Sequence, residues 1–74
     1  MTLDTVPVGN KAIIERVGGE GDLRLRLLDM GVIPKTEIYL TRMAPMGDPI
    51  EVRLRGYTLT LRLEDARKVE VRAL

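Results

Sequence analysis

The sequence lacks most of the side chains that carry protein chemistry. Its 74 residues include no cysteine, no histidine, no tryptophan and no phenylalanine. Without cysteine, neither disulfide bonds nor thiolate–metal staples can support so small a chain, and the absence fits a reducing compartment. Because histidine is the commonest general base and cysteine the best nucleophile, catalysis loses its usual residues. These absences predict a protein that acts by binding and is not an enzyme.

Aromatic residues and net charge are also scarce. The only aromatic side chains are Tyr39 and Tyr57, and the formal net charge is +1. Single-stranded nucleic acid is bound by aromatic platforms in a basic groove, and proline-rich peptides need an aromatic-lined groove. We therefore expect no nucleic acid partner. No apolar run approaches the roughly 18 residues of a membrane span, and the N-terminus is acidic where a signal peptide is basic. We expect a cytoplasmic protein that meets a membrane only through a partner.

The residues give little indication of a metal site, a phosphate site or an acid–base site. Transition metals favour imidazole and thiolate ligands, which are missing, and apolar packing explains Met30, Met43 and Met46. We expect no cofactor and no isolated metal site. The glycine-rich run 18–21 lacks the Gly-Lys-Ser/Thr ending of a phosphate loop, so it is interpreted as a connector. Asp48 and Glu51, the nearest carboxylate pair, are interpreted as a turn residue and a solvent-facing strand residue.

Glycine and proline divide the chain into short pieces, a pattern typical of a small barrel. Hydrophobic alternation predicts strands over 11–17, 36–43, 50–55, 58–63 and 68–73, with a helical turn at 64–67. A helix is predicted over 23–30, with Asp22 as its N-cap and Gly31 at its end. The sequence thus predicts one mainly β domain over 1–74. Its fold is a small five-stranded SH3-like barrel with one short helix inserted between strands 1 and 2.

The most specific local pattern is a β-hairpin. Gly56-Tyr57 has glycine first, as a two-residue type II′ turn requires. This turn predicts that Leu54 pairs with Leu59, Val52 with Leu61 and Ile50 with Leu63. On the other face, Glu51 would lie opposite Arg62.

Two apolar segments exceed what a core needs. They are the loop Met43-Ala44-Pro45-Met46 and the end of the helix, residues 30–33. An exposed apolar loop commonly marks an interface, although this loop is equally explained by folding over an open end of the barrel. The predicted partner-binding residues are Met43, Pro45 and Met46 in the loop, with Arg24 and Arg26 on the helix as polar partners.

Three motifs resemble, in order, elements of the ferrous iron transport protein A (FeoA) family. Leu25 to Pro34 resembles the family's RL-x-x-MG-x-x-P element, and Ala44 to Ile50 resembles its AP-x-GDP element. Gly56 to Arg62 resembles its G-x-x-LALR element. Lys35 replaces the glycine that usually follows the proline, which predicts a turn without a positive φ. Thr60 replaces a frequent alanine and is expected to face outward.

The resemblance implies an SH3-like barrel and a cytosolic accessory protein of bacterial ferrous iron uptake. The implied partner is the membrane transporter FeoB, through its cytosolic GTPase domain. The family is also associated with transition metals, which would imply direct iron binding or metal sensing. The residues of this chain do not support either, because they offer no suitable metal ligands. The alternative, drawn from similar domains in iron-dependent repressors, is an SH3-like regulatory domain that acts with a transcriptional repressor.

Overall fold

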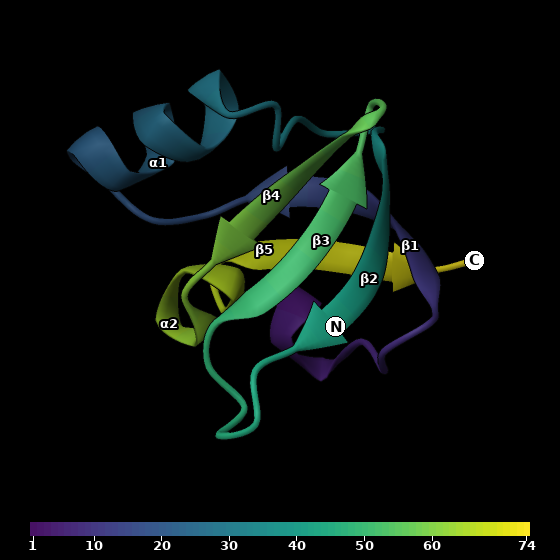
Figure 1. The fold of residues 1–74 in the computed structure, drawn as a ribbon. Helices are drawn as coiled ribbons and strands as arrows, with labels where there is room; N and C mark the ends of the chain where they lie inside the picture. Colours follow the sequence, from purple (N-terminus) through teal and green to yellow (C-terminus); the bar gives the residue numbers. More distant parts are fainter.

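The computed structural model describes all residues from Met1 to Leu74, and its centre is one antiparallel sheet of five strands. The strands follow the spatial order β4–β3–β2–β1–β5 and curve into a small barrel (Figure 1). Their bounds are β1 (Lys11–Val17), β2 (Glu37–Met43), β3 (Ile50–Leu54), β4 (Tyr57–Leu61) and β5 (Val69–Ala73). Helix α1 (Gly21–Asp29) lies between β1 and β2 in the chain. The prediction of a five-stranded SH3-like barrel with an inserted helix is confirmed.

Alternating side chains of the strands form the core. Ile38 and Leu40 of β2 and Val69 and Val71 of β5 are buried, as their alternation predicts. In β1 the alternation breaks after Ile14, because a bulge shifts the register there against β5. None of the helices has the length and hydrophobicity that a membrane-spanning helix needs.

Helix α1 begins earlier than predicted. Its N-cap is Glu20, which makes no side-chain cap hydrogen bond, so Asp22 lies within the first turn and is not the cap. The other end agrees with the sequence: Gly31 has φ +95° and ends the helix. Its N–H donates to the Leu28 carbonyl, and the Val32 N–H donates to the Leu27 carbonyl, both at 3.0 Å. These two bonds form a Schellman motif, which satisfies carbonyls that the helix end leaves free.

The hairpin is present, but its predicted register is wrong by two residues. Leu54 lies opposite Tyr57, Val52 opposite Leu59 and Ile50 opposite Leu61. The two-residue turn is therefore Arg55-Gly56, and both residues have positive φ, +51° and +85°. Positive φ at both central positions defines a type I′ turn, whose twist matches that of the strands. Glu51 consequently lies opposite Thr60, which is exposed as expected.

The expectation for Lys35 is also wrong, because this residue has φ +73°. Lys35 follows Pro34 in a turn closed by the Thr36 N–H, which donates to the Ile33 carbonyl at 3.2 Å. This position of a proline turn requires positive φ when the turn is of type II. The Lys35 N–H also donates to the Ile14 carbonyl at 2.6 Å, which ties the turn to β1. Tertiary hydrogen bonding thus overrides the residue's own preference.

Short segments finish the barrel. The 3₁₀ turn η1 (Leu3–Thr5) buries Leu3, and helix α2 (Leu63–Ala66) buries Ala66 between β4 and β5. The N-terminal segment also runs along the outer edge of β5: Thr2 bridges Glu70, and the Val71 N–H donates to the Met1 carbonyl at 2.8 Å.

Candidate partner-binding surfaces

The carboxylates near the β2–β3 loop have structural partners. Asp48 Oδ1 accepts the Leu63 N–H at 2.9 Å, which fixes the loop to the start of α2. Glu51 Oε2 accepts the Thr41 hydroxyl at 3.1 Å, and the same hydroxyl donates to the Glu51 carbonyl at 3.0 Å. No group of three or more His, Cys, Asp or Glu side chains is arranged to hold a metal ion. Both carboxylates therefore act in local structure.

The β2–β3 loop projects its apolar side chains into solvent. Met43, at the end of β2, is 39% exposed, Pro45 is exposed and Met46 is 93% exposed. The loop keeps its shape through its own backbone, since the Ala44 N–H donates to the Pro49 carbonyl at 3.0 Å and the Gly47 N–H to the Ala44 carbonyl at 2.7 Å. Met46 therefore stands on a formed turn, free of the core.

Helix α1 carries Arg24 and Arg26, whose side chains line different grooves. Arg24 Nε donates to the Val17 carbonyl at 3.2 Å, so this guanidinium crosses back to the end of β1. Arg26 makes no ion pair and lies beside β4 and α2, lining a separate groove. Of the helix side chains only Leu27 is fully buried, and Leu25 is 58% exposed.

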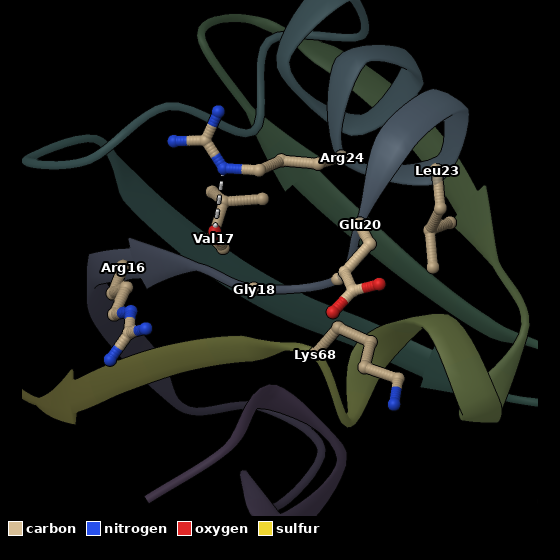
Figure 2. A pocket seen from close by; sticks show the side chains of 8 residues that line it. Arg16, Val17, Gly18, Glu20, Leu23, Arg24 and Lys68 are labelled. Atoms are coloured by element: carbon tan, nitrogen blue, oxygen red, sulfur yellow. Dashed lines mark hydrogen bonds between the residues drawn. The ribbon is translucent and has the colours of Figure 1, made fainter.

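The groove at the start of α1 is polar and of mixed charge. It has a volume of about 720 Å³ and is lined by Arg16, Val17, Gly18, Gly19, Glu20, Leu23, Arg24 and Lys68. Figure 2 shows that Arg16, Glu20 and Lys68 come from three different segments around it. The Gly18 N–H donates to the Lys68 carbonyl at 2.6 Å, which joins the β1–α1 connector to the residue before β5. The run 18–21 itself supplies a carboxylate, Glu20, and no lysine, serine or threonine, in line with its interpretation as a connector.

The second groove lies between α1 and β4. It has a volume of about 450 Å³, and residues of three elements line it: Arg26 and Met30 from the helix region, Thr60, Leu61 and Arg62 from the strand region, and Glu64 and Asp65 from α2. We call it the α1–β4 groove. Arg62, like Arg26, has no ion-pair partner.

The structure does not bring the predicted binding residues together. The loop that holds Met43, Pro45 and Met46 lies at the lower end of the molecule in Figure 1, whereas α1 lies at the upper left. Sequence reasoning found the exposed loop but missed the α1–β4 groove. Thr60 and Arg62 were expected to face outward, but the groove that they line depends on which strand the helix lies beside.

Comparisons with known proteins support one family. A family model described as the FeoA domain matches residues 1–73. The Fe(2+) transport protein A/Fe(2+) transporter FeoB fusion protein of Porphyromonas gingivalis is 41% identical to this chain over 71 residues. That match covers 96% of this chain and only 8% of the fusion protein.

Solved structures agree with the family model. A FeoA-like protein from Clostridium acetobutylicum is 40% identical with a TM-score of 0.93, and the match covers all of this chain and 86% of that one. The FeoA of Stenotrophomonas maltophilia, a prokaryotic SH3 domain protein solved with zinc, is 27% identical with a TM-score of 0.85. That match covers 96% of this chain and 88% of that one.

Proposed function

Because this chain belongs to the FeoA domain family, we propose that it is a cytoplasmic accessory protein of ferrous iron uptake. Its proposed action is to bind the cytosolic GTPase domain of the FeoB transporter and to regulate that transporter. The observation that carries the proposal is the fusion protein, in which a segment 41% identical to this chain shares one polypeptide with FeoB. Joining two modules in one chain raises their effective concentration, which benefits proteins that work in contact.

The surface chemistry supports binding as the mode of action. Met46 exposes nearly its whole side chain on a formed loop, and Arg26 has no ion-pair partner. Exposed thioethers adapt to irregular apolar surfaces, and arginine is enriched in interfaces. We propose Met43, Pro45 and Met46 as one contact region. We propose Arg24 and Arg26 as further contacts on helix α1, where they line two different grooves.

The proposal is tested by calorimetric titration of the chain with the cytosolic part of FeoB, in its GDP-bound and GTP-analogue-bound states. Met46→Asp and Arg26→Glu test the two regions separately, because they lie at different ends of the molecule. If the substituted residue contacts FeoB, each substitution should raise the dissociation constant about tenfold or more. This corresponds to a loss of about 1.4 kcal/mol in binding free energy.

Two matched controls carry the same changes elsewhere. Val8→Asp places a carboxylate at another exposed apolar position, and Arg53→Glu reverses another exposed arginine without an ion pair. Both are expected to bind FeoB like the unmodified chain. If all four variants fold and bind alike, the assignment of contact regions is wrong. If the unmodified chain binds FeoB in neither nucleotide state, the proposed function is wrong.

A further inference from the structure

The two edges of the sheet differ in what covers them. Along β5, the outer edge is occupied by the N-terminal segment, through the Thr2–Glu70 bridge and the Val71 N–H donated to Met1. Along β4, no backbone hydrogen bond reaches residues 57–61 except from β3. Because Leu54 and Tyr57 flank a two-residue turn, they exchange hydrogen bonds, and so do the alternate pairs that involve Leu59 and Leu61. Thr58 and Thr60 therefore direct their N–H and C=O groups outward.

Helix α1 runs antiparallel to this free edge. The end of the helix lies at the start of β4, where the Tyr57 hydroxyl contacts Gly31. Arg26 in its second half and the C-cap Met30 line the α1–β4 groove together with Thr60 to Arg62. Its start, at Leu23, lies near Glu64 and Asp65 of α2. A helix beside an edge strand often seals it, but here the two walls leave a groove of about 450 Å³ between them.

We infer that the α1–β4 groove is a strand-addition site. An extended segment of the partner lies in it, pairs with the outward backbone groups of Thr60, which lines the groove, and continues along β4 to those of Thr58. This inference rests on the proposed function, and its occupant is a segment of the FeoB cytosolic domain. Strand addition in a groove between an edge strand and a helix is an established way to recognise peptides, in which main-chain hydrogen bonds give affinity and side-chain pockets give specificity. An extended chain with 4.7–4.9 Å spacing from β4 would continue the sheet.

The charged side chains that line the groove predict the charge of the partner segment. Arg26 of α1 and Arg62, just after β4, line the same groove as Thr60, and neither has an ion-pair partner. Glu64 and Asp65 lie at the α2 end. We therefore infer a segment with a carboxylate at the level of Thr60, because an acidic side chain there would meet both arginines. The two carboxylates of α2 would favour a basic residue further along the segment.

The test removes one outward donor without touching the pairing of β3 with β4. Thr60→Pro deletes a backbone N–H that points away from β3, a position at which an edge strand tolerates proline. Thr60→Val is the matched control, since it changes the side chain and keeps the N–H. Titrated with the FeoB cytosolic domain, Thr60→Pro should bind at least tenfold more weakly, and Thr60→Val within about twofold of the unmodified chain.

A second measurement uses the unmodified chain. In the complex, the amide hydrogens of Thr58 and Thr60 should exchange with solvent at least tenfold more slowly than in the free chain. Thr58→Pro, which removes the other outward N–H, is the second variant if Thr60→Pro does not fold. Binding by a folded proline variant at the unmodified affinity, or unchanged exchange at both threonines in the complex, would overturn the strand-addition site and leave the proposed function standing. If the unmodified chain does not bind FeoB, both are overturned.

Discussion

Gly31 joins the end of α1 to the tip of the β3–β4 hairpin. Its φ of +95° is a conformation that side chains rarely adopt, and a Cβ at this position would collide with the Tyr57 hydroxyl. The backbone conformation thus demands glycine here, and an added Cβ would also force the tip of the Tyr57 side chain to move. The glycine of the Met30-Gly31 motif therefore has a structural purpose that reaches beyond the helix end, because it lets Tyr57 hold the helix against the strand.

Gly31→Ala is expected to lower the free energy of unfolding by about 2 to 4 kcal/mol, from positive φ and overpacking together. Gly56→Ala is the matched control, since Gly56 also has positive φ (+85°) but nothing within 4 Å of the added Cβ. This control should lose only about 1 kcal/mol. Urea unfolding of both variants measures the difference, and equal losses would show that the Tyr57 contact carries no energy.

Asp48 fixes the β2–β3 loop by accepting the Leu63 N–H at 2.9 Å. Asp48→Ala removes this acceptor at the start of α2 and should lower the free energy of unfolding by about 1 kcal/mol, as lost helix caps do. Asp48→Asn retains a carbonyl oxygen at the same place and should lose less. The midpoints of urea unfolding compare the two. An Asp48→Ala variant as stable as the unmodified chain would contradict a capping role.

At the scale of elements, the hairpin turn decides the register of β4. Arg55 occupies a turn position with φ +51°, which asparagine adopts more readily than arginine. Arg55→Asn creates the Asn-Gly pair that type I′ turns prefer and should raise the free energy of unfolding by about 0.5 kcal/mol. In the register with Gly56-Tyr57 as the turn, residue 55 would belong to a strand, where asparagine is unfavourable. Thermal unfolding distinguishes the two registers. A midpoint temperature for Arg55→Asn below that of the unmodified chain would contradict the type I′ turn.

The same hairpin shows what the sequence can and cannot predict. Alternation placed Val52 and Leu54 inward correctly, because facing depends only on a residue's own strand. A shift of two residues keeps every side chain on its face, so alternation could not separate the two registers. The positive φ of Arg55 separates them, and arginine gives no signal of it. Lys35 was mispredicted for the same reason.

Of the candidate surfaces, the sequence likewise predicted the one that depends on local pattern and missed the one that depends on tertiary contact. Exposure of Met46 followed from an apolar loop rich in turn residues, and the structure leaves it 93% exposed. The α1–β4 groove could not be predicted, since it depends on Arg26 lying across from Arg62, two residues on elements whose contact is tertiary. Local pattern therefore located an exposed segment, whereas the groove required the path of the helix beside the sheet.

At the scale of the whole molecule, the sheet has one edge sealed by its own N-terminal segment and the other open beside a helix. The exposed loop with Met46 lies at the far end (Figure 1). This arrangement presents two grooves beside α1 and one apolar projection on a barrel with no grouped metal ligands. Such a surface suits a protein that docks onto a larger partner.

The central claim, that the chain acts by binding FeoB, is tested most directly by NMR titration. The isotope-labelled chain would be titrated with the cytosolic part of FeoB in its GDP-bound and GTP-analogue-bound states. We predict saturable shifts in at least one state, largest for amides of α1 and β4 and for the 43–46 loop, with those of β5 unchanged. Absence of shifts in both states, with binding instead to an iron-dependent repressor, would contradict the account and favour the regulatory alternative.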